Sequence, residues 1–219
     1  MREQQKNLGK DSADGVNPTL TFFRQWLKNP LSVAALSPSS RQLARLMIRE
    51  LPAAAQRVVE FAGGTGVFTR ALLAHGIRPD QLMVFELNEE LHQYLHRRFP
   101  SARVICGDAR ELRQIAERER YAAPGEIDAV LSGLGLLSMS RRLQREIFQA
   151  AFSMLGPNGR FIQFTYGPVS PVSRELLDEL GLDVRRGGFA WWHIPPASVY
   201  VFERRRSRAV RPRRASDKA

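Results

Sequence analysis

Strand-like and helix-like segments alternate along the chain from Arg57 onward, and this alternation constrains the fold more than any other feature. Apolar runs typical of buried strands recur at 58–61, 81–86, 103–106, 127–131 and 159–165. Segments with helical periodicity follow them at 67–75, 89–99, 109–122, 140–155 and 171–181. Such alternation predicts an α/β fold with a mostly parallel sheet and helices on both faces. Two late strands, at about 183–191 and 198–204, allow a terminal hairpin that makes one of seven strands antiparallel.

The segments outside this alternating region divide the rest of the chain. Residues 1–18 are polar and predict a disordered lead, and residues 205–219 predict a basic disordered tail. Between the lead and the α/β domain of 57–204 lies a helical segment, 19–56. Its first helix carries Phe22, Phe23 and Trp26 on one face and ends at Pro30. Its second helix follows a Ser-Pro-Ser-Ser turn, with Leu43 and Met47 on one side.

Charge and composition limit the environments in which the protein can act. The net charge is +11, and 43% of the residues are hydrophobic. Residues 203–219 hold eight Arg or Lys against two acids, and residues 20–57 hold six against one. Two basic ends around a neutral core predict attraction to an anionic surface, either lipid or nucleic acid. Cys106 is the single cysteine, and the chain shows neither a signal peptide nor a membrane-spanning run. We expect a cytoplasmic protein that is peripheral on the inner face of a membrane.

A glycine-rich turn follows the first predicted strand. Residues 60–66 read EFAGGTG, so the strand ends near Glu60, and Gly64 and Gly66 open the next helix. Glycines at such a turn let backbone N–H groups approach a ligand, with a helix N-terminus behind them. The pattern indicates a nucleotide site, although glycine-rich turns after strands are common.

Two more acids follow the second and third predicted strands. Glu86, followed by Leu87, suits both hydroxyl groups of a ribose, and Asp108, followed by Ala109, suits an adenine amino group. Together with Glu60 they lie at the carboxyl edge of the sheet, where open α/β sheets bind ligands. Ser132 follows the fourth predicted strand at the same edge.

The choice of nucleotide rests on charge and on the glycine spacing. A dinucleotide fold prefers Gly-x-Gly-x-x-Gly, but Thr69 takes the third glycine's position. Glu60 would also repel a pyrophosphate, whereas it suits the ammonium group of S-adenosylmethionine. The sequence therefore predicts a Rossmann-like methyltransferase that uses S-adenosylmethionine and yields S-adenosylhomocysteine.

The whole pattern resembles class I methyltransferases, and its flanks resemble the bacterial phospholipid N-methyltransferases. The matching segments are FRQWLKNP at 23–30, LSPSSR at 36–41, GVFTRALL at 66–73, SGLGLLSM at 132–139, QFTYGP at 163–168 and IPPASV at 194–199. That family is also similar in its core to ribosomal RNA adenine dimethyltransferases. The chain departs from the family at Ala62, Gly135 and His193, where Gly, Pro and Asn are usual. The methyl group of Ala62 is expected to crowd the cofactor turn.

The resemblance implies methyl transfer to the head-group nitrogen of phosphatidylethanolamine, with up to three transfers giving phosphatidylcholine. The aromatic and basic residues of the 20–29 helix suit an anionic membrane interface, and packing on the protein's own core is the competing interpretation. Tyr166, after the fifth strand, is the candidate for shaping the acceptor site. His193 is a candidate base, and Arg41 a candidate partner for a lipid phosphate.

Two other functions remain open from the sequence. The basic ends also suit an rRNA adenine N6-methyltransferase, but residues 132–136 read SGLGL and offer no aromatic ring to stack a base. A catalytically impaired membrane-binding paralogue would explain Ala62 and Gly135. No metal site is expected, because His92 and His96 form a helical pair without a further ligand. The oligomeric state is not determined by the sequence.

Overall fold

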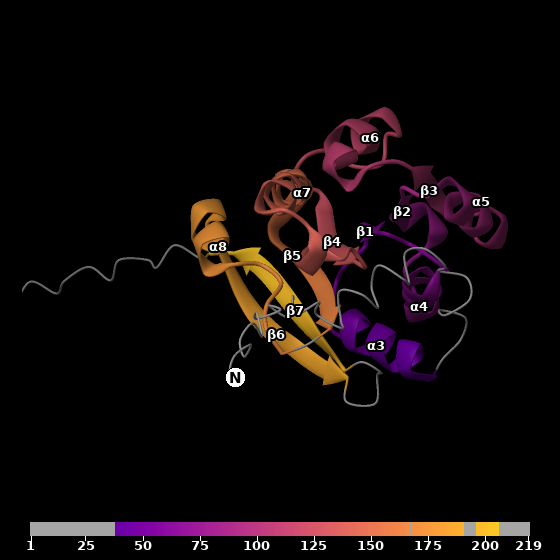
Figure 1. Ribbon diagram of the computed structural model, residues 1–219. Coiled ribbons are helices and arrows are strands. Elements are labelled where there is room, and N and C mark those ends of the chain that lie inside the picture. The colour runs from indigo at the N-terminus through magenta and orange to yellow at the C-terminus, as the bar shows by residue number, and fades with distance from the viewer. Residues whose placement is uncertain (1–37, 167, 191–195, 206–219) are drawn as a thin grey trace, which may run out of the picture.

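A seven-stranded mixed sheet forms the centre of the molecule (Figure 1). The computed structural model describes residues 38–166, 168–190 and 196–205. The strands are β1 Val58–Phe61, β2 Leu82–Glu86, β3 Arg103–Cys106, β4 Ile127–Ser132, β5 Leu155–Tyr166, β6 Leu182–Ala190 and β7 Ala197–Arg204. Their order is β3-β2-β1-β4-β5-β7-β6. Strands β1 to β5 are parallel, and β7 is antiparallel to both of its neighbours, as the terminal hairpin predicts.

Helices cover both faces of this sheet. They are α3 Pro38–Ile48, α4 Val67–His75, α5 Glu89–Arg98, α6 Leu112–Arg118, α7 Arg141–Met154 and α8 Arg174–Leu180. Short 3-10 helices lie at η1 Pro79–Gln81, η2 Ala109–Glu111 and η3 Leu136–Ser138. Buried residues of α3, α4 and α5 form one apolar cluster with the sheet, and those of α6, α7 and α8 form the other. The α/β architecture expected from the alternation is therefore confirmed.

Strand β5 is the element whose start differs most from the expectation. It begins at Leu155, directly after α7, because Leu155 pairs with Ile127 before a bulge resets the register with β4. The segment Gly156-Pro157-Asn158-Gly159 has the composition of a turn, which hides the strand start in the sequence.

Helix α3 crosses the terminal hairpin and runs opposite to β6. Glu50, just beyond its C-terminal end, forms an ion pair of 2.7 Å with Arg185, and its carbonyl oxygen accepts a hydrogen bond from Arg160. Leu46 packs against Gly188, where a Cβ atom would lie 3.1 Å from a Leu46 methyl. The N-terminal end of α3, with Arg41, therefore points toward the carboxyl edge of the sheet. Among the described residues, no helix has the length and apolar character needed to cross a bilayer.

Candidate active site

The strand order reverses between β1 and β4, and the predicted ligand-binding residues gather at the carboxyl edge around that point. Glu60 is the third residue of β1, Glu86 ends β2, Asp108 follows β3 and Ser132 ends β4. Glu60 and Glu86 lie on adjacent parallel strands, and Phe61 pairs with Ser132 across the β1–β4 ladder. This is the crevice in which open α/β sheets bind ligands.

The glycine-rich turn has the backbone shape that its composition predicts. Gly64 and Gly66 have φ values of +55° and +78°, and a Cβ atom on Gly66 would lie 2.3 Å from the Phe99 ring. Ala62 also has a positive φ, +58°, which a side chain rarely adopts. The family resemblance expects glycine at this position, so the departure at Ala62 has a physical consequence: a strained backbone beside the ligand crevice.

Glu60 is fully buried beneath this turn. Its Oε2 accepts a hydrogen bond of 2.6 Å from the Thr69 hydroxyl, and its Oε1 is buried without a hydrogen-bond partner. Burial raises the pKa of Glu60 from 4.5 to about 8, while the hydrogen bonds from Thr69 partly oppose that rise. A buried carboxyl with one unpaired oxygen beside Gly63 fits a site whose ligand brings a positive charge.

Glu86 connects the turn to the next helix. One of its carboxylate oxygens accepts from the Gly64 N–H at 2.9 Å, and the other from the Asn88 N–H at 2.9 Å. The carboxylate is thereby fixed in position at the end of β2, and each oxygen retains a second lone pair for a ligand hydroxyl. Leu87, which follows it, is 69% exposed at the same edge.

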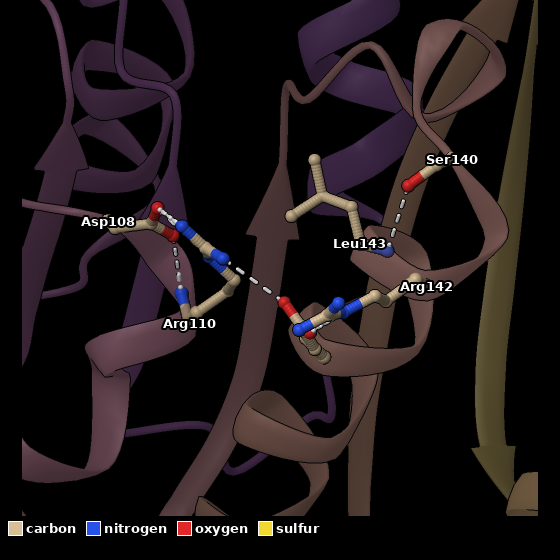
Figure 2. Close-up of polar contacts among 6 residues, drawn as sticks. Asp108, Arg110, Ser140, Arg142 and Leu143 are labelled. Carbon is tan, nitrogen blue, oxygen red and sulfur yellow. Dashed lines mark hydrogen bonds and ion pairs between the residues drawn. The ribbon is translucent and has the colours of Figure 1, made fainter.

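Asp108 is held by Arg110 (Figure 2). Its carboxylate accepts from the backbone N–H of Arg110 at 2.9 Å and from the guanidinium at 2.7 Å, and Arg110 also reaches Glu146 on α7 at 3.1 Å. The hydrogen bonds from Arg110 hold the pKa of Asp108 below its ordinary value, so the carboxylate is ionised at neutral pH. Ala109, the next residue, is buried against the α7 side of the sheet.

The loop after β4 is tied down by two buried glutamine side chains. Gln163 on β5 donates to the Leu134 carbonyl at 2.8 Å, and Gln144 on α7 donates to the Leu136 carbonyl at 2.7 Å. Gly135 accepts two hydrogen bonds from Ser138, one from its N–H and one from its hydroxyl. The carbonyls of Leu134 and Gly135 are therefore engaged within the protein, which leaves them poorly placed to orient an acceptor amine.

Tyr166 ends β5 at the same edge and is partly buried. Burial raises the pKa of its phenol to about 12, so the ring stays neutral across the physiological range. The ring packs edge-on against Phe164, whose own ring contacts Phe68 on α4. Arg41 is exposed at the end of α3 that points toward this edge.

Four predicted site residues lie outside the described residues. They are Phe22, Phe23, Trp26 and His193. Sequence reasoning also missed three residues that shape the site. Thr69 is the hydrogen-bond partner of Glu60, and Gln144 and Gln163 hold the loop after β4. A polar residue inside an apolar strand, such as Gln163 in FIQFT of β5, is a signal for such a support, whereas Gln144 lies among charged residues in RRLQRE and gives no such signal.

The opposite, amino edge of the sheet carries a polar hollow of about 590 Å³. Its arginines Arg57 and Arg78 form ion pairs with Glu126 and Asp80. The hollow lies at the other end of the strands from the glycine-rich turn and the three acids, so it is not part of the candidate site. No group of three or more potential metal ligands occurs among the described residues.

The residues at the carboxyl edge fit S-adenosylmethionine. Glu60 supplies a buried carboxyl group that a cationic ligand would ionise, the turn at Gly64 and Gly66 leaves room for close backbone approach, and the fixed carboxylate of Glu86 suits a ribose. Asp108, which follows the neighbouring strand β3, provides an ionised carboxylate that can accept a hydrogen bond from an adenine amino group.

Comparison with known proteins identifies the family. Over 186 residues the chain is 32% identical to an ornithine lipid N-methyltransferase of Singulisphaera acidiphila, an alignment that covers 82% of this chain and 92% of that protein. The chain belongs to the family of this lipid N-methyltransferase. It is accordingly an S-adenosylmethionine-dependent methyltransferase. A comparison with models of protein families gave no match.

Solved structures support the same fold. A TehB-like methyltransferase of Corynebacterium glutamicum matches with a TM-score of 0.56 and 17% identity, over 85% of this chain and 98% of that one. The 1,6-didemethyltoxoflavin-N1-methyltransferase of Burkholderia thailandensis, solved with S-adenosylhomocysteine, matches with a TM-score of 0.59 and 17% identity, over 85% and 87%. The class I methyltransferase fold expected from the sequence is thus confirmed.

Proposed function

We propose that this methyltransferase N-methylates the head-group amine of a membrane lipid. The observation that carries the proposal is the 32% identity with an ornithine lipid N-methyltransferase across nearly the whole of that enzyme. Ornithine lipid is therefore the first acceptor to test. Phosphatidylethanolamine, implied by the sequence resemblance, is the second, because both lipids present a primary amine.

The geometry supports an amine acceptor at the carboxyl edge. When bound, S-adenosylmethionine supplies a methyl group that is activated by its sulfonium. The acceptor's ammonium group would release its proton to water before its nitrogen could bond to that carbon, and the carbon–sulfur bond would break with its electron pair left on sulfur. The described residues would position the acceptor and exclude water from it. Tyr166 and the loop around Gly135 lie at the carboxyl edge of the sheet, and Ser132, at the end of β4, is fully buried.

The proposal includes a place of action. The basic segment 20–57 and the net charge of +11 suit a peripheral protein on the anionic cytoplasmic face of the inner membrane. Residues 19–56 are proposed as a membrane-binding segment, of which the structure describes 38–56 with α3, and 205–219 as a basic tail. Arg205, at the start of that tail, forms ion pairs with Asp178 and Asp183 on the domain.

Methyl transfer with defined acceptors tests the proposal. The full-length protein is incubated with methyl-labelled S-adenosylmethionine and phosphatidylglycerol vesicles that carry ornithine lipid, phosphatidylethanolamine or no amine-bearing lipid, and separately with total RNA. We expect label in one or both amine-bearing lipids and none in the amine-free vesicles. Label in RNA alone would overturn the proposal in favour of nucleic-acid methylation.

A further inference from the structure

Exposed large apolar side chains are confined to one edge of the described structure. Leu87, Leu137 and Val169 are 69%, 47% and 71% exposed, and they are the large apolar residues found exposed among the described residues. Each follows a strand at its carboxyl end: Leu87 follows β2, Leu137 lies in η3 after β4, and Val169 lies after β5. Scattered exposed apolar residues need no explanation, but three at one edge do.

Leu137 and Val169 lie on two loops that are joined and fixed. The Gln144 side-chain amide donates to the Leu136 carbonyl at 2.7 Å and to the Pro171 carbonyl at 3.2 Å, so one buried side chain holds both loops. On the other side of Val169, the Pro168 carbonyl accepts from the Tyr200 hydroxyl and from Arg186. The two apolar side chains are thus presented on supported loops rather than on free ends.

Three arginines follow these apolar residues closely in the chain and lie at helix N-termini, where a positive charge destabilises the helix. Helix α7 begins with Arg141 and Arg142 and has no acid in its first turn, and α8 begins with Arg174. The N-terminus of a helix carries partial positive charge, so cations there are unfavourable. All three arginines are exposed. Nearby, Glu146 is paired with Arg110 and Arg142, and Glu175 follows Arg174 on α8.

We propose that Leu137, Val169, Arg141, Arg142 and Arg174 form a docking rim that rests on an anionic lipid bilayer. The apolar pair enters the head-group layer, and the arginines contact lipid phosphates or carboxylates. The inference deepens the proposed function, on which it rests, by naming the face turned to the membrane.

The position of the rim suits a lipid acceptor. Leu137 is two residues beyond Gly135, and Val169 is three residues beyond Tyr166, so both lie next to the residues that border the reacting edge. A head group that reaches this edge from a bilayer would leave its acyl chains in the lipid layer beside Leu137 and Val169. The acceptor then need not leave the membrane to be methylated.

Site-specific fluorophores test the contact directly. In a Cys106→Ser background, the variants Leu137→Cys, Val169→Cys and Ala123→Cys are each labelled with an environment-sensitive nitrobenzoxadiazole dye. Ala123 is exposed in the loop before β4 at the amino edge and serves as the matched control. With phosphatidylglycerol vesicles we expect a blue shift and an intensity gain at 137 and 169 but not at 123. Silence at both rim positions would overturn the inference.

Binding and turnover provide the second test. Leu137→Ser/Val169→Ser and Arg142→Glu should each lower partitioning onto phosphatidylglycerol vesicles by about tenfold. Arg78→Glu makes the same charge change at the amino edge, where Arg78 is likewise paired with an acid, and should lower it less than twofold. Suppose that Arg142→Glu and Arg78→Glu lower vesicle partitioning equally and that the apolar double variant does not lower it. Binding would then depend only on net charge, and the proposal would be overturned.

Failure of the docking rim and failure of the proposed function give different results. If the rim variants lose methylation of vesicle lipid but keep methylation of the same lipid in detergent micelles, both proposals hold. If the dyes report insertion but no amine-bearing lipid is methylated, the rim stands and the acceptor is wrong. If a dye at 137 or 169 shifts with protein concentration alone, without vesicles, the rim is covered by a second copy of the protein and the inference fails.

Discussion

Single residues in and beneath the glycine-rich turn combine backbone strain with a buried carboxyl group, and both have measurable consequences. Glu60 has a pKa of about 8 in the folded protein against an ordinary value of 4.5, because burial favours its neutral form. The folded state therefore holds a proton that the unfolded chain releases above pH 4.5. This contribution to stability is fully present below pH 4.5 and is lost as the pH rises through 8.

Replacement of Glu60 by glutamine should flatten this pH dependence. Glutamine still accepts the Thr69 hydrogen bond but does not titrate, whereas the ligand-free wild type should lose about 1.4 kcal/mol of unfolding free energy per pH unit between about 5 and 8. Urea unfolding at a series of pH values measures the slope. Parallel slopes for wild type and variant would show that Glu60 is already ionised when the protein is folded.

Ala62→Gly should relieve the strain at φ +58°. An alanine in this left-handed region costs about 1–2 kcal/mol, and the added freedom of glycine in the unfolded chain offsets about half of that. We expect a gain of about 0.5–1 kcal/mol in unfolding free energy and tighter binding of S-adenosylmethionine. Ala62→Val serves as the opposite control and should lose stability. A variant Ala62→Gly that is less stable than wild type would mean that the methyl group makes favourable contacts.

At the scale of elements, the loops after β4 and β5 depend on α7. Gln144→Leu removes the amide that joins both loops while it keeps the volume of a buried side chain. We expect a loss of about 1–3 kcal/mol in unfolding free energy, since two carbonyls lose a partner. We also expect a lower kcat with an unchanged dissociation constant for S-adenosylmethionine, because the cofactor turn lies on other elements. A change in cofactor affinity alone would place the cofactor nearer to α7 than we infer.

The same scale shows what the sequence does and does not reveal. Local patterns predict β3 and α4 to the residue, because their apolar periodicity and flanking glycines are clear. The start of β5 was missed because its bulge contains Gly-Pro-Asn-Gly, which is typical of a turn. The acids at the strand ends are visible in the sequence, but the Arg110–Asp108 pair and the Gln144 link depend on contacts between distant elements.

For the molecule as a whole, one edge of the sheet carries both the nucleotide-binding residues and the exposed apolar residues, while the opposite edge is occupied by ion-paired arginines. We therefore expect donor binding and membrane contact to occur at the same edge of the sheet. The family relationship supplies methyl transfer from S-adenosylmethionine, and we propose the carboxyl edge as the place where the donor and a lipid amine meet.

Calorimetric binding of S-adenosylmethionine to wild type and to Glu86→Ala tests this account most directly. Glu86 holds the cofactor turn through Gly64, and Glu90→Ala, an exposed change on the neighbouring helix, is the matched control. With folding verified by circular dichroism, we predict at least tenfold weaker binding for Glu86→Ala and unchanged binding for Glu90→Ala, since charge-assisted hydrogen bonds of this kind contribute about 1.5–3 kcal/mol. Equal affinities for all three proteins would contradict the proposed cofactor site.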